Sequence, residues 1–98
     1  MARFTTRVEL HSADYADYLR LHEEMAKEGY WNRISDQAGN LYHLPPAEYI
    51  IERNITIDDA LLAAKQAANR TGKTSSILTT EALQWRWLDL PIASLKSA

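Results

Sequence analysis

The sequence predicts a single α+β domain in which strands and helices follow the order βαββαβ. Three observations predict it: an alternating polar and apolar segment at the start of the chain, two segments with helical apolar spacing, and short β-rich segments around them. The 98 residues, 46% of them hydrophobic, suit one core. We expect one domain over residues 1–90 and a flexible tail over residues 91–98.

The first two elements are predicted between residues 3 and 29. Residues 3–11 alternate between inward and outward positions, which is typical of a half-buried strand. Ser12 is expected to cap the helix that follows, and Gly29 to end it. The apolar stripe expected on this helix, with His22 near its centre, is Tyr15, Tyr18, Leu19, Met25 and Ala26.

A hairpin is predicted next. Residues 30–34 and 41–44 are its strands, and the polar turn at residues 36–40 contains Gly39. Pro45 and Pro46 lack backbone donors, so the second of these strands is expected to be interrupted or bulged there and to resume at residues 48–53, at a sheet edge.

The last helix and strand complete the pattern. Thr56 and Asp59 resemble a capping box, Ile55 is placed to contact Ala60 across the cap, and Gly72 is expected to end the helix. Its apolar stripe is mostly alanine, which permits close packing on a sheet. Residues 74–81 form the last expected strand, with a continuation towards residue 87. This order is that of the ferredoxin-like fold, with two helices on one face of a four-stranded antiparallel sheet.

Composition and charge narrow the classes of function. The formal net charge is −2, but residues 12–28 sum to −3, which leaves the rest of the chain at +1. An anion-binding surface is therefore expected outside that helix. No apolar run is long enough for a membrane span and no secretory signal is visible, so a cytoplasmic location is expected. The absence of cysteine, of paired histidines and of a phosphate-binding loop predicts no metal and no cofactor, and nothing points to DNA.

Aromatic and basic residues are interleaved near Trp31 and Arg33 and again at Trp85, Arg86 and Trp87. This combination suits stacking and phosphate contacts on single-stranded nucleic acid. Packing in a core or a dimer interface is the alternative. His22 is likewise open to two interpretations, a partly buried structural histidine or a group that transfers protons.

Several residues resemble those of the GhoS-type antitoxins, which are small ferredoxin-like proteins related in fold to the CRISPR-associated small nuclease. The similarity covers about residues 4–81 in the order and length of the elements. The residues that carry it are Tyr18-Leu19-Arg20-Leu21, Ile34, Asp36, Gly39, Leu44 and an aromatic residue at Tyr49.

The resemblance implies a type V toxin–antitoxin role, in which the antitoxin is a sequence-selective endoribonuclease that cleaves the single-stranded messenger RNA of a membrane-damaging toxin. Arg20 matches the first basic position of the family's helix. His22 stands where a second arginine occurs, and Tyr49 replaces a phenylalanine. Metal-independent cleavage needs an acid, a base and a cation, so we expect His22 and Arg20 to be catalytic. Arg7, Arg33 and Tyr49 are the expected RNA-binding residues.

The alternative function is a non-catalytic ferredoxin-like protein-interaction module. It would form a homodimer in which Leu83, Trp85 and Trp87 pack against a second copy. A small-molecule binding module of similar fold is a third possibility, supported only by the aromatic content.

Overall fold

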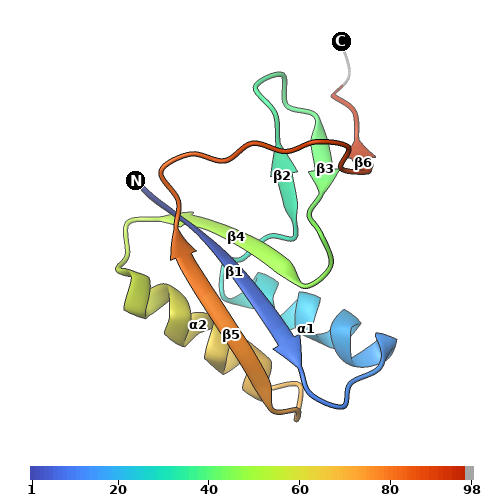
Figure 1. The fold of residues 1–98 in the computed structure, drawn as a ribbon, viewed down its shortest axis with the longest axis vertical. Coiled ribbons are helices and arrows are strands. Elements are labelled where there is room, and N and C mark those ends of the chain that lie inside the picture. Colours follow the sequence, from blue (N-terminus) through green and yellow to red (C-terminus); the bar gives the residue numbers. More distant parts are fainter. Residues whose placement is uncertain (97–98) are drawn as a thin grey trace.

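The computed structural model describes residues 1–96, within which the chain forms two helices and six strands (Figure 1). The helices are α1 (Tyr15–Lys27) and α2 (Ile57–Asn69). The strands are β1 (Ala2–Leu10), β2 (Arg33–Ser35), β3 (Leu41–His43), β4 (Glu48–Arg53), β5 (Ser75–Glu81) and β6 (Ile92–Ser94). No helix within residues 1–96 is long and apolar enough to cross a membrane.

The strands form two three-stranded antiparallel sheets, so the prediction of one four-stranded ferredoxin-like sheet is wrong. The larger sheet has the order β4-β1-β5, and the smaller has the order β2-β3-β6. An isolated bridge between Trp31 and Ile50 joins the start of the β2 segment to β4. Each of these two residues donates its backbone N–H to the other's carbonyl at 2.8 Å.

The break between β3 and β4 explains the two sheets. The chain there contains Pro45 and Pro46, which donate no backbone hydrogen bond, and Ala47, whose φ of 63° is not that of a strand. The sequence predicted that β4 resumes β3, and this prediction is wrong. The two strands belong to different sheets. The edge position expected for residues 48–53 is confirmed.

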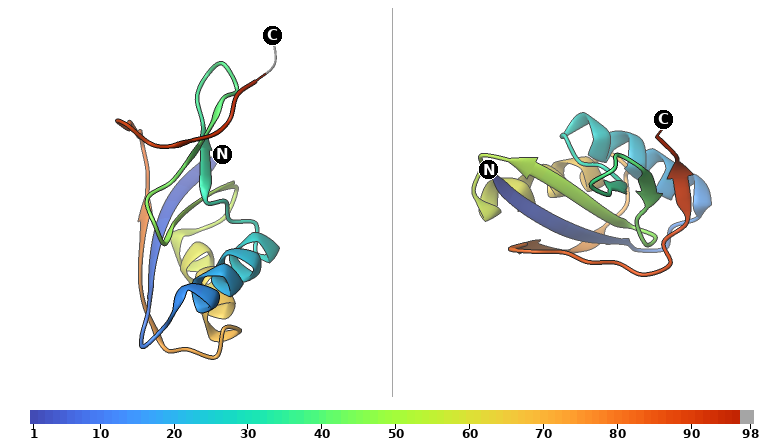
Figure 2. Two further views of the ribbon diagram at one scale, coloured as in Figure 1. Left: turned by 90° about the vertical axis from the view of Figure 1, so that its right-hand side faces the viewer. Right: turned by 90° about the horizontal axis from the view of Figure 1, so that it is seen from above.

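Both helices cover the same face of the larger sheet, as the left view of Figure 2 shows. The core lies between the two helices and the larger sheet. It contains Phe4 and Val8 from β1, Leu21 and Met25 from α1, and four alanines of α2. The other face of this sheet carries the alternate residues of β1, which include Arg3, Thr5 and Arg7.

The two helices begin with capping boxes, one of them predicted. Thr56 and Asp59 form the box of α2, as expected. At α1 the cap is Asp14, which exchanges hydrogen bonds of 3.0 Å with Asp17, so the prediction of Ser12 is wrong. Ser12 has a φ of 52° and lies in the turn before the helix. Asp14 is better placed because its carboxylate oxygen reaches the N3 amide.

The buried side of α1 also differs from the predicted stripe. Leu21, Glu24 and Met25 are buried, whereas Tyr15 is 79% exposed. Tyr15 is the first residue of the helix, and the core lies beneath the later turns. The periodicity therefore identified the helix and two residues of its inward side, Tyr18 and Met25, but missed Leu21 and Glu24.

The segment after β5 has no regular structure until β6. It runs from the end of the larger sheet to the smaller one (Figure 1), so the expected continuation of the strand through Trp85 and Trp87 is not found. Within the tail expected over residues 91–98, β6 pairs with β3, Leu41 opposite Ser94 and Tyr42 opposite Ile92. Residues 97 and 98 lie outside the described residues.

Candidate functional site

An open cleft of about 910 Å³ lies where the two sheets meet. Residues of β1, β2, β4 and the segment after β5 line it. Its distinctive side chains are three tryptophans and three arginines, namely Trp31, Trp85, Trp87, Arg3, Arg33 and Arg86. We call this set the Trp–Arg cleft.

Local contacts hold the tryptophans of the cleft in place. The backbone bridge to Ile50 fixes Trp31, whose side chain remains 58% exposed. The guanidinium carbon of Arg3 lies 4.9 Å from the centre of the Trp85 ring, a cation–π distance. The ring of Trp87 lies 5.7 Å from that of Tyr42. Two of the rings are thus supported from the large and the small sheet.

Arg3 also fixes the irregular segment after β5. Its Nη2 donates a hydrogen bond of 2.6 Å to the carbonyl of Leu83, next to the cation–π contact with Trp85. The backbone N–H of Ala82 donates to the carbonyl of Arg3 at 2.7 Å. One residue of β1 therefore positions one wall of the cleft.

The cleft is modestly positive. Its three arginines face two acidic residues, Asp36 and Glu52, in a chain whose formal net charge is −2. Hydrogen bonds from Asn40, with a further one from the Tyr42 hydroxyl, hold the pKa of Asp36 below its ordinary value. Asp36 is therefore a charged acceptor that fixes the turn between β2 and β3. The Arg33 side chain, in contrast, is exposed to solvent in the cleft.

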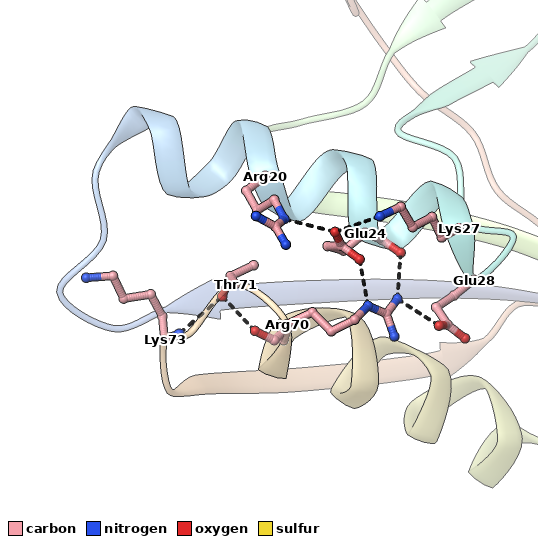
Figure 3. Close-up of polar contacts among 8 residues, drawn as sticks. Arg20, Glu24, Lys27, Glu28, Arg70, Thr71 and Lys73 are labelled. Atoms are coloured by element: carbon pink, nitrogen blue, oxygen red, sulfur yellow. Dashed lines mark hydrogen bonds and ion pairs between the residues drawn. The ribbon is translucent and has the colours of Figure 1, made fainter.

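Arg20 lies away from the cleft, in an ion-pair network between the two helices (Figure 3). The centre of the network is Glu24, which is 1% exposed. Its carboxylate accepts hydrogen bonds from Arg70 at 2.6 Å, Arg20 at 2.9 Å and Lys27 at 3.0 Å. These donors, Arg70 first, lower the pKa of Glu24 to about 2. Arg70 also bonds Glu28 at 2.8 Å, which ties α2 to α1.

The sequence carries a signal for only part of this network. Arg20, Glu24 and Lys27 have the i, i+4 and i, i+3 spacing of helical ion pairs, which was the available signal. Arg70, however, is 46 residues from Glu24. Only the packing of α2 on α1 brings the two together.

His22 points to a different neighbour. Its Nδ1 is hydrogen-bonded to the hydroxyl of Tyr49 on β4 at 2.6 Å, and the two rings lie 5.6 Å apart. Partial burial lowers the pKa of His22 below 6.5. Tyr49 is buried, and that burial raises its phenol pKa. A neutral imidazole at neutral pH follows, one that can accept a proton.

The structure thus distributes the five expected site residues over three places. Arg33 lines the Trp–Arg cleft. Arg20, His22 and Tyr49 are on the helix side of the larger sheet, where Arg20 contacts Glu24 of α1 and His22 contacts Tyr49 of β4. Arg7 is exposed on the opposite face of that sheet, in register with Glu48 and Leu78. The expected interface residues Trp85 and Trp87 turn inward to the cleft, while Leu83 is exposed.

Within residues 1–96, no three His, Cys, Asp or Glu side chains come together as a group that could hold a metal ion. Comparison with models of known protein families finds no match, and comparison with curated protein sequences finds none either. The resemblance to the GhoS-type antitoxins therefore stays a prediction.

Proposed function

We propose that the protein binds single-stranded RNA in the Trp–Arg cleft. The observation that carries the proposal is the gathering of three tryptophans and three arginines in one open cleft. Aromatic rings stack on bases of any sequence, and arginines contact the phosphates between them. RNA, rather than DNA, is the ligand suggested by the family resemblance.

The state of the side chains supports stacking. More than half of the Trp31 side chain is exposed, so a base can reach it. Contacts with Arg3 and Tyr42 already hold Trp85 and Trp87 in place. Binding therefore costs little conformational entropy at these two side chains. Arg33 is exposed beside them and is available to a phosphate.

Cleavage of the RNA is the second part of the proposal, and it rests on the resemblance together with His22. Arg20 and His22 lie on α1, outside the Trp–Arg cleft, so a cleaved RNA must extend from the cleft to the helix side of the larger sheet. In metal-independent cleavage the ribose 2′-oxygen attacks the adjacent phosphorus, a base takes the 2′-hydroxyl proton, and an acid protonates the departing 5′-oxygen. His22 is the proposed base, since its lowered pKa leaves it neutral, and water from the solvent is the proposed acid that protonates the departing 5′-oxygen. Arg20, still partly exposed beside Glu24, is the proposed cation.

Binding is tested by the affinity of the wild type and of Trp31→Ala for a short fluorescent single-stranded RNA. Loss of one stacked base costs about 1–3 kcal/mol, so Trp31→Ala is expected to bind about 5- to 150-fold more weakly. The control is Tyr15→Ala, which removes an exposed aromatic from α1, outside the cleft. Equal affinities of the wild type and Trp31→Ala would contradict the proposed site. A single-stranded DNA of the same sequence tests the choice of RNA.

Cleavage is tested separately with EDTA present. Wild type, Arg20→Ala/His22→Ala, and an RNA with 2′-O-methyl riboses are compared. Cleavage by the wild type alone, and only of the unmodified RNA, is the expected result. Binding without cleavage would leave an RNA-binding protein and remove the catalytic roles of His22 and Arg20.

A further inference from the structure

β5 is an edge strand that lacks the usual protection against pairing. It contacts β1 on one side only, because the order of the sheet within the described residues is β4-β1-β5. Its seven residues contain no proline and no lysine, and Glu81 is their only charge. Leu78, at the middle of the strand, is 69% exposed. Long edges with few charges and an exposed apolar side chain readily accept another strand.

The backbone groups at this edge can be assigned. The N–H of Ala82 donates to Arg3, and the N–H of His11 donates to Thr74. Since hydrogen-bonded pairs alternate along an antiparallel ladder, the even-numbered residues of β5 bond to β1. The odd-numbered residues, Ser75, Ile77, Thr79 and Glu81, therefore direct N–H and C=O to the open edge.

We propose that two copies of this chain pair antiparallel through β5, with the twofold axis at Leu78. In this register Ile77 lies opposite Thr79 of the partner subunit, and Ser75 lies opposite Glu81 of the partner subunit. These are the residues whose backbone groups point outward, so each pair exchanges hydrogen bonds. The two Leu78 residues face each other as a non-hydrogen-bonded pair, about 4.5 Å apart at Cα.

The charges near the strand favour this antiparallel register. Lys73 and Glu81 are the only charged residues between positions 71 and 85. The Lys73 Nζ is engaged within its own chain, because it donates to the carbonyl of Ser12 at 3.1 Å and lies 3.7 Å from the Asp17 carboxylate. Glu81 is therefore the charge that decides the register, and antiparallel pairing places it opposite the uncharged Ser75 of the partner subunit. Parallel pairing would instead align Glu81 with its own copy, and like charges directly opposite are destabilising.

Apolar side chains on α2 lie beneath the same edge. Arg70 marks the flank of α2 that faces α1, because it bonds Glu24 there. Helical spacing puts Ile57 and Leu61 on the opposite flank, towards β5, and both are 40% exposed. A partner strand at the edge would cover part of this surface as well as Leu78.

This dimer differs from the one that the sequence predicted. It uses β5 in place of Leu83, Trp85 and Trp87, and no residue of β5 lines the Trp–Arg cleft. The larger sheets of the two copies would become one continuous six-stranded sheet, with one Trp–Arg cleft at each end. Dimerisation through β5 therefore does not depend on RNA binding in the Trp–Arg cleft.

Sedimentation equilibrium over a range of concentrations tests the proposal, with the full chain. The wild type is expected to reach twice the monomer mass reversibly. Leu78→Lys and Leu78→Glu each place two like charges at the axis, and each is expected to weaken the dimer by more than about 100-fold. Mixing the two variants restores a dimer, because the opposed charges then attract. Leu62→Lys, at a half-exposed leucine on the outer side of α2, is the matched control and is expected to dimerise like the wild type.

A wild type that stays monomeric at its highest soluble concentration would overturn the proposal. Dimers of unchanged affinity in both Leu78 variants would overturn it as well, since the contact would then lie elsewhere. Amide hydrogen exchange gives a second test that needs no variant. The amides of Ile77 and Thr79 are expected to exchange more slowly as the concentration rises, and exchange that does not depend on concentration contradicts the pairing.

Discussion

Tyr30→Phe is a substitution whose effect on stability can be worked out from the structure. The Tyr30 side chain is almost completely buried. Its hydroxyl donates to the carbonyl of Ala60 in α2 at 2.7 Å and is hydrogen-bonded to Thr6 of β1 at 2.9 Å. The substitution removes only this hydroxyl, which links the larger sheet to α2.

The magnitude depends on what the former partners keep. The Thr6 hydroxyl retains Thr79, which is 3.1 Å away. The carbonyl of Ala60 lies in the first turn of α2 and can still accept a helical backbone hydrogen bond. Neither partner is left unpaired, so the larger penalty for an orphaned buried group does not apply. Two hydrogen bonds at about 1 kcal/mol each give an expected loss of about 2 kcal/mol.

Urea unfolding at neutral pH measures this loss by linear extrapolation, with an unchanged m-value. The midpoint of thermal unfolding is expected to fall by about 8–16 °C. The matched control is Tyr42→Phe, which removes one hydrogen bond to Asp36, an acceptor that keeps its bonds from Asn40. Its expected cost is about 1 kcal/mol or less. A loss below about 0.5 kcal/mol for Tyr30→Phe, or a larger loss for the control, refutes the reasoning.

Three further outcomes are expected. The logarithm of the affinity for single-stranded RNA should fall linearly with the logarithm of the salt concentration, with a slope of magnitude at most about 2, because each of the three arginines contributes about 0.7. Arg33→Ala should reduce this magnitude by about 0.7. An unchanged slope in Arg33→Ala argues against a contact between Arg33 and a phosphate. The pKa of Glu24 is lowered from 4.5 to about 2, so its contribution to stability is complete above pH 4.5 and is lost as the pH falls towards 2. Urea unfolding of Glu24→Gln should therefore depend less on pH in that window than unfolding of the wild type, and equal pH dependence would contradict the assignment. NMR titration of His22 should give a pKa below 6.5, and because burial is the cause, the pKa of His22 should stay below 6.5 in Tyr49→Phe. A pKa at or above 6.5 would contradict the burial argument. Since the pKa of His22 is lowered in the folded state, the free energy of unfolding should fall as the pH drops below 6.5.

Local patterns in the sequence determined the elements of this protein. The alternation at residues 3–11 predicts β1, and Thr56 with Asp59 predicts the start of α2. Both features depend on neighbours a few residues apart, so a single sequence carries them. The sequence also indicated the aromatic and basic residues of the cleft, because Trp31 is two positions from Arg33 and Trp85 is next to Arg86.

Only the tertiary structure decided which strands pair and which helix face is buried. Pairing joins segments far apart in the chain, and the pattern of a strand does not name its partner. β3 therefore pairs with β6 and not with a continuation into β4. Glu24 could be buried because Arg70 comes from the other helix. The Trp–Arg cleft depends in the same way on Arg3, whose contacts with Leu83 and Trp85 span some 80 residues of chain.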